Sequence, residues 1–254
     1  MAGLFLERKT RMVDVLVAST DSGRLTARPH GHRLANNVPW RILCPQWMGA
    51  SWVCLHVGRA SETRTFAVEA EPLDIDGVVL LRADRHEDER GFLSEVYNRR
   101  ALEQIGIRDD FVQENHIRSH QSGTIRGLHF QIKPHPAAKL LRVVRGAIFD
   151  VVVDLRHDSP TYGEHVTVEL SEENWTQIYI PVGLAHGLCT LESNTEITYR
   201  VSDYWSPNVD RGVLWNDPHL EIDWPVSDEK AIVSDKDWSQ PRLADLPRFF
   251  EKGE

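Results

Sequence analysis

Histidine and lysine side chains occur in short apolar runs of this sequence, where they could carry out acid–base chemistry. The segment GTIRGLHFQ contains Arg126 and His129 after a glycine turn, and PVGLAHG contains His186 after a Pro-Gly turn. Lys139 begins a further apolar run, KLLRVVRGAIFDVVVDL. A histidine can remove a proton near neutral pH, and a lysine can stabilise the enolate oxygen that results. These residue types therefore suit proton transfer next to a carbonyl group.

The same histidines could instead bind a metal ion. Cupins that bind metal use an HxH pair, a downstream glutamate and a later histidine in a PxGxxH turn. Here LHF offers one histidine where two are needed, and Lys139 takes the place of the glutamate. A protonated ammonium repels a divalent cation and offers it no ligand. The sequence therefore predicts a pocket without a metal ion.

Short β-type runs must position these side chains. From about Glu71 onwards, runs such as GVVLLRA, EHVTVEL, TQIYIPV and EITYRVSDYW alternate with Gly, Pro, Asp and Asn. Helical patterning is confined to NRRALEQIG and the tail around Leu243. Strands that do not alternate with helices argue against a parallel Rossmann sheet. We therefore expect an all-β sandwich, jelly roll or barrel.

Residues 1–65 differ from the rest of the chain. They hold nine Lys and Arg against four Asp and Glu, and segments such as RLTARPHGHRLANNVPW are broken by Pro and Gly. A transit peptide, a regulatory tail and upstream sequence translated from a misplaced start are all compatible with this composition. We expect a poorly ordered segment without a catalytic role.

The composition of the chain indicates its cellular location and the kinds of partner it can bind. The three cysteines show neither CxxC nor zinc-finger spacing, so a disulfide scaffold and a structural zinc are disfavoured and a cytoplasmic location is expected. The sequence contains no run of about 18 apolar residues, so no membrane span is predicted. The net charge of −9 over 254 residues argues against nonspecific binding to nucleic acid.

Nine motifs follow one another between residues 88 and 237. They are DERGFLSE, FVQENH, RGLHFQ, KLLRVVRGAIFDVVVDLR, SPTYG, IPVGLAHG, YRVSDYWSP, WNDP and SDKD. In this order they resemble the dTDP-4-dehydrorhamnose 3,5-epimerase family of cupin-type sugar-nucleotide epimerases. The resemblance implies a double-stranded β-helix (cupin jelly roll) with a few short helices over residues 69–246. An irregular N-terminal extension, residues 1–68, would precede it, and a C-terminal tail, residues 247–254, would follow.

The resemblance also implies catalytic roles. His129 matches the family's base, Asp237 the carboxylate that orients it, and Tyr199 the general acid on the opposite face of the sugar. Lys139 would lie near the C4 oxygen. Each of the last three has an ordinary structural alternative: a helix cap for Asp237, a strand-core residue for Tyr199 and protection of an edge strand for Lys139.

Further residues match positions expected to contact the substrate. Trp205 stands where many family members carry a second tyrosine. Its indole could stack on the thymine base, but it lacks the phenol hydroxyl, so base and sugar selectivity are left open. His186 could also serve only the architecture of its turn. The expected substrate-binding residues are Arg90, Glu95, Gln113, Asn115, Arg126, Asp150, His186 and Trp205.

The expected reaction is epimerisation at C3 and C5 of dTDP-4-dehydro-6-deoxy-D-glucose, which gives dTDP-4-dehydro-L-rhamnose. No cofactor is implied, and the family resemblance implies a homodimer formed by strand exchange. Two alternatives stay open. The chain could be a 3-only or 5-only epimerase of a related dTDP-4-keto-deoxysugar, or a cupin that binds a nucleotide sugar without turning it over.

Overall fold

A computed structural model describes residues 16–21, 24–29, 46–48, 51–53 and 68–250 of the chain. The chain divides into two compact units, Met1–Thr65 and Phe66–Glu254. In the first unit, the antiparallel pairs are β1 (Leu16–Asp21) with β2 (Arg24–Pro29) and β3 (Gln46–Met48) with β4 (Ser51–Val53). The expectation that this extension is poorly ordered falls mainly on residues outside the described ranges and stays a prediction.

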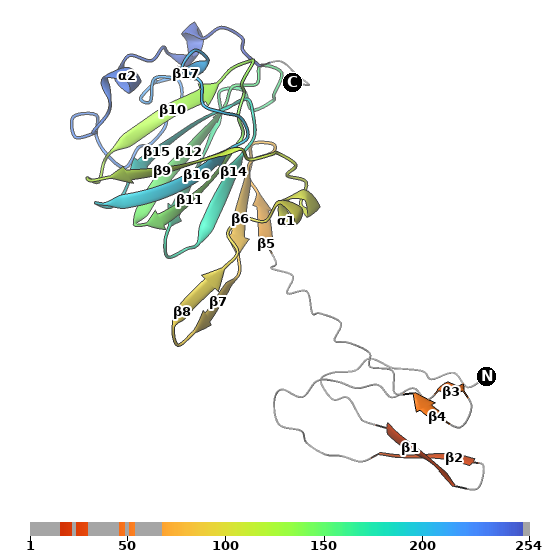
Figure 1. The fold of residues 1–254 in the computed structure, drawn as a ribbon. Coiled ribbons are helices and arrows are strands. Elements are labelled where there is room, and N and C mark those ends of the chain that lie inside the picture. The colour runs from red at the N-terminus through yellow and green to blue at the C-terminus, as the bar shows by residue number, and fades with distance from the viewer. Residues whose placement is uncertain (1–15, 22–23, 30–45, 49–50, 54–67, 251–254) are drawn as a thin grey trace. The chain divides into compact units, whose positions relative to one another are not determined.

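Two antiparallel sheets form the second unit (Figure 1). The six-stranded sheet has the order β5 (Val68–Pro72), β6 (Val79–Ala83), β14 (Thr176–Ile180), β11 (Lys139–Arg145), β16 (Thr195–Val201) and β9 (Gln113–Ser119). The five-stranded sheet has the order β13 (His165–Ser171), β12 (Ala147–Asp154), β15 (Leu184–Thr190), β10 (Ile125–Gln131) and β17 (Asp210–Gly212). A separate hairpin, β7 (Arg85–Asp88) and β8 (Gly91–Ser94), extends away from both sheets. This architecture confirms the predicted all-β jelly roll.

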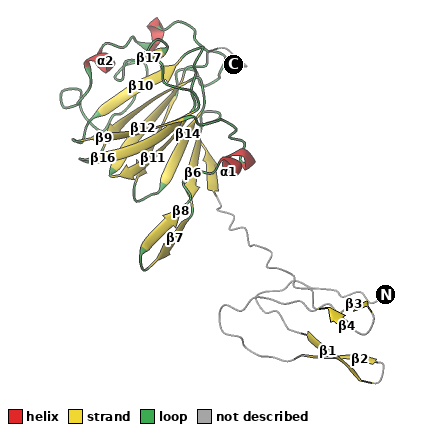
Figure 2. Ribbon diagram, in the orientation of Figure 1, coloured by secondary structure: helices red, strands yellow, loops and turns green. Residues whose placement is uncertain are grey.

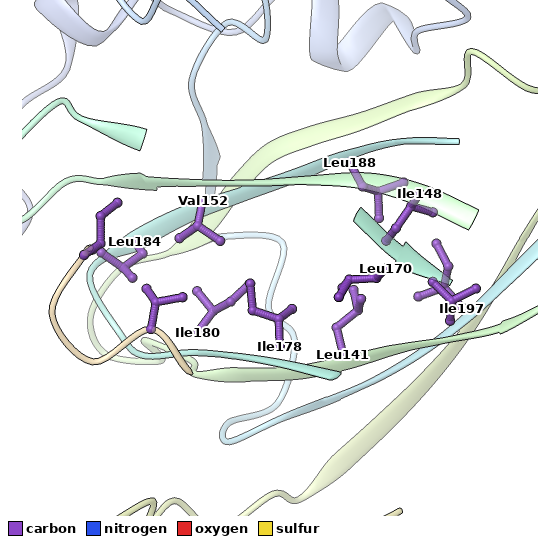
Figure 3. Packing of buried hydrophobic residues seen from close by; sticks show 12 residues of the cluster. Leu141, Ile148, Val152, Leu170, Ile178, Ile180, Leu184, Leu188 and Ile197 are labelled. Carbon is purple, nitrogen blue, oxygen red and sulfur yellow. The ribbon is translucent and has the colours of Figure 1, made fainter. Parts of the chain in front are cut away.

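The main core lies between the two sheets (Figure 3). Leu141 and Ile197 enter it from the six-stranded sheet, and Ile148 and Val152 enter it from β12. Because side chains alternate along a strand, Val151 and Val153 of β12 point the other way, into a second cluster completed by Phe250. Strand β12 is therefore apolar on both faces, which explains its nearly continuous hydrophobic sequence.

The C-terminal residues take part in this second cluster. Phe249 and Phe250, which belong to the segment expected to be a tail, have ring centroids 5.7 and 5.8 Å from that of Phe130 on β10.

In β10 the alternation of side chains between the two faces of the sheet is interrupted at one place. This interruption changes which side chains of β10 face the interior. The register between β10 and β15 shifts between Arg126 and His129, so one extra residue is accommodated there. Gly127 lies at the shift with φ +132°, a conformation that favours glycine. Ordinary alternation would put residues 126 and 129 on opposite faces, whereas an added residue lets both face the same way.

Helices are few and short, as Figure 2 shows. Helix α1 (Arg99–Gln104) begins at the N-cap Asn98, within the run expected to be helical. Helix α2 (Asp235–Trp238) follows the N-cap Ser234, and a 3-10 turn covers Leu243–Asp245. Among the described residues, no helix is long and apolar enough to cross a bilayer.

Candidate active site

A cavity of about 390 Å³ opens between the two sheets next to the apolar core, and both sheets contribute side chains to it. The sequence-predicted residues that line it are Gln113, Asn115, Arg126, His129, Lys139, His186, Tyr199 and Trp205. Asp237 and Asp150 lie directly behind two of these side chains, as hydrogen-bond partners of His129 and His186. Ten of the twelve predicted site residues therefore meet at one place.

The six-stranded sheet supplies one wall. Strand register places Tyr199 opposite Asn115 on one side and opposite Leu141 on the other. Lys139 is two residues from Leu141 and so shares its face. Alternate residues of these strands thus form a single surface, polar around Tyr199 and Lys139 and apolar where it enters the core at Ile197.

The five-stranded sheet supplies the opposite wall, with an imidazole–carboxylate pair. His129 Nε2 is 2.6 Å from Asp237 Oδ1, and Asp237 Oδ2 accepts a hydrogen bond from Gly127 N at 3.4 Å. Burial by itself would raise the pKa of Asp237, but the hydrogen bonds from His129, Gly127 and Ser234 outweigh it and lower that pKa. Asp237 is therefore a carboxylate, which accepts a hydrogen bond from Nε2–H and leaves Nδ1 as the basic nitrogen.

Lys139 lies next to this pair. Its Nζ donates a hydrogen bond to the backbone oxygen of His129 at 3.0 Å. Burial lowers the pKa of Lys139 to about 8, and the carboxylates of Asp210 and Asp150 oppose a larger fall. With that pKa, roughly nine-tenths of the lysine stays cationic at neutral pH.

A second imidazole–carboxylate pair supports the same wall. His186 Nε2 is 2.8 Å from Asp150 Oδ2, and both side chains are buried. Burial lowers the pKa of His186, and the attraction of Asp150 only partly compensates. Val152 is opposite His186 in the register, and His129 is opposite His186 on the other side, so the two histidines lie side by side on adjacent strands.

Tyr199 keeps its proton at neutral pH. Burial and the nearby charge of Asp210 raise the pKa of the phenol above its usual value, while Arg126 and a hydrogen bond with Asn115 oppose the shift. A protonated phenol across the cavity from His129 is placed to act as a proton donor.

The structural alternatives for two residues can now be judged. Lys139 begins β11, an inner strand of its sheet, so it does not protect an edge. The helix cap near Asp237 is Ser234, whose side chain accepts from Asp237 N at 3.2 Å, while the carboxylate of Asp237 bonds to His129.

Arg90 and Glu95 do not reach the cavity of their own chain. Arg90 lies at the tip of the β7–β8 hairpin, where its guanidinium pairs with Asp88. Glu95 accepts a hydrogen bond from Asn98 Nδ2 at 2.7 Å, before helix α1. If these two residues contact substrate, as the family resemblance implies, they must do so in the cavity of another chain.

Sequence reasoning did not assign Gln131, Asp210 or Lys236 to the site, although all three line the cavity. Gln131 accepts from Ser206 N at 2.7 Å and donates to Tyr204 O at 3.3 Å, so it holds the loop that carries Trp205. A signal for Gln131 and Lys236 was present, because both fall inside matched motifs. Asp210 lies outside every motif.

Three further histidines, His116, His120 and His135, do not line the cavity. His116 pairs with Glu196 and His135 with Asp203. Within the described ranges, no three His, Cys, Asp or Glu side chains are grouped as a metal site would require. The expected absence of a metal ion stays a prediction.

The jelly roll, the imidazole–carboxylate pair and the facing phenol together define a cupin-type epimerase. The family model described as dTDP-4-dehydrorhamnose 3,5-epimerase matches residues 72–245. The chain belongs to this family, which confirms the relationship that its motifs indicated.

Individual relatives agree with this assignment. A dTDP-4-dehydrorhamnose 3,5-epimerase of Sinorhizobium fredii is 44% identical over 181 residues, covering 71% of this chain and 92% of the relative. A crystal structure of that enzyme from Bacillus anthracis, with TDP and PPi bound, shares 45% identity and a TM-score of 0.67 over 69% of this chain and 99% of its own. A Legionella pneumophila epimerase solved with dTDP-4-keto-L-rhamnose shares 39% identity and a TM-score of 0.67, over 71% and 95%.

Proposed function

We propose that this chain converts dTDP-4-dehydro-6-deoxy-D-glucose into dTDP-4-dehydro-L-rhamnose by inverting C3 and C5 without a cofactor. The observation that carries this proposal is the placement of His129, paired with Asp237, on one wall of the cavity and of Tyr199 on the other. Family membership supports the same reaction and substrate.

The reaction needs groups on opposite faces of the sugar. The C4 ketone acidifies the protons on C3 and C5, so His129 Nδ1 can remove one of them and the electron pair moves to the C4 oxygen as an enolate. Tyr199 then delivers a proton to the other face of the same carbon. The imidazolium and the phenolate return to their starting states by proton exchange with solvent, and the cycle repeats at the second carbon.

The enolate oxygen requires a positive charge or a hydrogen-bond donor. Lys139 Nζ has three donors and uses one on His129 O, so others can point to the C4 oxygen. Arg126, beside Tyr199, suits the diphosphate because its planar guanidinium can donate two parallel hydrogen bonds. Gln113, Asn115 and the indole of Trp205 are assigned to the nucleotide and the sugar.

A homodimer would explain why Arg90 and Glu95 do not reach the cavity of their own chain. The β7–β8 hairpin that carries Arg90 extends away from the two sheets. Its Phe92 and Leu93 are 49% and 62% exposed. Exchange of this element would bury these apolar side chains and bring the arginine to the cavity of the partner. A cytoplasmic location is proposed with it, consistent with the free, buried thiol of Cys189.

The test is incubation with dTDP-4-dehydro-6-deoxy-D-glucose in heavy water, coupled to a downstream reductase and NADPH. Deuterium at both C3 and C5 together with NADPH oxidation is expected. Label at one carbon alone would identify a single-centre epimerase. Tight binding without exchange at either carbon would identify a nucleotide-sugar-binding cupin, and the proposed reaction would be wrong.

A further inference from the structure

The β7–β8 hairpin, which carries Arg90 at its tip, needs outside contacts to hold its direction (Figure 1). It is a two-stranded sheet of its own, and no further strand pairs with it in the described part of the chain. Every residue of its two strands except Ser94 is exposed. A lone two-stranded hairpin is marginally stable in water. Contacts at its base must therefore keep it paired and set where it points.

Trp175 supplies such contacts from a part of the chain 81 residues away from Ser94. Its indole Nε1 donates a hydrogen bond to Ser94 Oγ at 3.1 Å, and its ring lies edge-on to Phe92 with centroids 4.9 Å apart. The guanidinium carbon of Arg85 is 4.9 Å from the centroid of the indole and 4.3 Å from that of Phe92. The faces of aromatic rings attract such a cation. We call these four side chains, Arg85, Phe92, Ser94 and Trp175, the aromatic clamp.

The aromatic clamp uses one face of the hairpin. Arg85 is opposite Ser94 in the strand register, and Phe92 is two residues from Ser94, so these three side chains share a face. Glu87, opposite Phe92, is on the same face and pairs with Arg85 at 3.3 Å. Leu93 is on the other face and is 62% exposed. The hairpin is therefore bound to its own chain through one face and presents Leu93 on the other.

Trp175 is itself held firmly. It lies in the turn between β13 and β14, with φ +54°, a backbone conformation that residues other than glycine seldom adopt. The side chain of the preceding Asn174 fixes this turn. Its Oδ1 accepts from Ser171 N at 3.2 Å and from Thr176 N at 3.1 Å, and its Nδ2 donates to Glu169 O at 2.8 Å. The indole is thus anchored to the sheet, and the hairpin is anchored to the indole.

The direction of the hairpin decides where Arg90 lies. The four residues of β7 span about 13 Å between the aromatic clamp and the turn that carries Arg90. A rotation of about 10° at the base therefore moves the tip by roughly 2 Å. Misplacement of a substrate-positioning group by about 1 Å can cost about 10²-fold in rate. A small loss of rigidity at the base is enough to disturb a site at the tip.

We propose that Trp175 and Arg85 are positioning residues: the aromatic clamp fixes the direction of the hairpin and thereby places Arg90 in the cavity of the partner chain. This inference rests on the proposed function and on its homodimer. It gives a role to Trp175, which lies outside all nine motifs. It also requires that the aromatic clamp of one chain acts on the cavity of the other chain.

Mixed dimers test this requirement. In a dimer of His129→Ala with Arg90→Ala, the one complete site takes Arg90 from the first chain and His129 from the second. Trp175→Leu is added to one chain or to the other. In the His129→Ala chain, which supplies the hairpin, it should lower the kcat/KM of the mixture by about tenfold or more. In the Arg90→Ala chain, which supplies only the cavity, it should leave kcat/KM unchanged.

A second variant and a control accompany this comparison. Arg85→Met should repeat the asymmetry, because it keeps an unbranched side chain but removes the cation between the two rings. The matched control is Arg82→Met, three residues earlier in the chain. Arg82 is 55% exposed and pairs only loosely with the exposed Glu69, at 3.6 Å. It should change kcat/KM in neither chain.

Three results would overturn the proposal. Equal losses from Trp175→Leu in either chain would make the aromatic clamp a general stabiliser of the fold. A loss confined to the Arg90→Ala chain would mean that it acts on the cavity of its own chain. A parent mixture without activity, made from a wild-type chain that turns over the substrate, would rule out the shared site and the proposal with it.

Hydrogen exchange without substrate keeps the inference separate from the proposed reaction. In the full chain, the amides of residues 85–94 should exchange about tenfold faster or more in Trp175→Leu and Arg85→Met than in the wild type and in Arg82→Met. The amides of β14 should keep their protection. Unchanged exchange in both variants would show that the aromatic clamp does not hold the hairpin, whatever the chain catalyses. Faster exchange in a chain that turns over no dTDP sugar would show that the proposed reaction is wrong and that the aromatic clamp still holds the hairpin.

Discussion

At the scale of single residues, burial sets the ionisation of the cavity before any substrate arrives. It lowers the pKa of Lys139 and raises that of Tyr199, and Asp210 acts on both groups in the upward direction. A cationic lysine and a neutral phenol therefore coexist at neutral pH. These are the states needed to stabilise an enolate and to donate a proton.

The base and the acid should be separable by mutation. In His129→Ala no enolate forms, so turnover and the exchange of C3 and C5 protons with solvent should both fall by about 10²-fold or more. Tyr199→Phe keeps the ring but removes the donor hydroxyl, so solvent deuterium can still enter while inversion fails at one or both carbons. Mass spectrometry and NMR of the recovered sugar follow both events. Full double inversion by Tyr199→Phe would transfer the role of acid to another group, with Tyr204 the next to test.

The alkaline limit of activity is expected to be set by Lys139. Because its pKa is about 8, kcat/KM should fall as the pH rises through that value and the ammonium loses its proton. The charged groups that face it are Asp210 and Asp150, which both hold the pKa up. Asp210→Asn removes one of them, so the alkaline limb should move to lower pH. A pH profile of kcat/KM checks this, and an unmoved or upward-shifted limb would show that another group sets the limit.

How far the site could be predicted differs from residue to residue. His129, Lys139, Tyr199 and Asp237 lie in motifs, and the structure brings them to one cavity. Asp210 has no motif around it, and its role depends on the pairing of β17 with β10, a long-range register that local sequence does not encode.

At the scale of elements, the irregularity in β10 decides which side chains can act together. Period-two alternation holds along β9, where partly buried and exposed side chains alternate, and in β11 the register with β16 shifts only near the end of the strand, between Val143 and Arg145. Applied to β10, it would place Arg126 and His129 on opposite faces, although both line the cavity. The glycine at position 127 was visible in the sequence, but only the register with β15 shows that a residue is added there.

Gly127 should therefore tolerate no side chain. A Cβ at this position would lie 2.4 Å from Gly187 Cα, which is backbone and cannot swing aside. Gly127→Ala is expected to lower the free energy of unfolding by roughly 2 kcal/mol more than Gly106→Ala. Gly106 is the matched control because its φ is also positive, at +95°, while nothing lies within 4 Å of an added Cβ. Equal losses in denaturant titrations would mean that backbone strain, and not the close approach of β10 and β15, explains the glycine.

At the scale of the whole molecule, the epimerase unit should be independent of the N-terminal unit. Every matched motif and the family match over residues 72–245 lie within Phe66–Glu254. Deletion of residues 1–65 should leave kcat and the thermal midpoint of residues 66–254 essentially unchanged. Activity and melting of the truncated chain are the measurements. Insolubility, or the loss of most of the turnover, would show that the extension contributes to folding or assembly.

The assembly itself can be tested through the residues that do not reach their own cavity. Arg90→Ala and His129→Ala should each give an inactive or nearly inactive homodimer, since every site then lacks one required group. If Arg90 acts in the partner's cavity, a mixed dimer contains one site in which His129 comes from one chain and Arg90 from the other.

Mixing the two variants after reversible dissociation should therefore restore activity, up to about one quarter of the wild-type level when the chains pair at random. Sedimentation of the mixture confirms that dimers have re-formed. His129→Ala mixed with Lys139→Ala is the control. Both side chains belong to the cavity of one chain, so every cavity in a mixed dimer lacks either His129 or Lys139. Activity would return only if the two chains also exchanged the strands that carry these residues. Recovery for the first mixture alone supports a shared site, because the structure places Arg90, and neither His129 nor Lys139, outside the cavity of its own chain. Equal failure of both mixtures would place Arg90 outside the catalytic site of either chain.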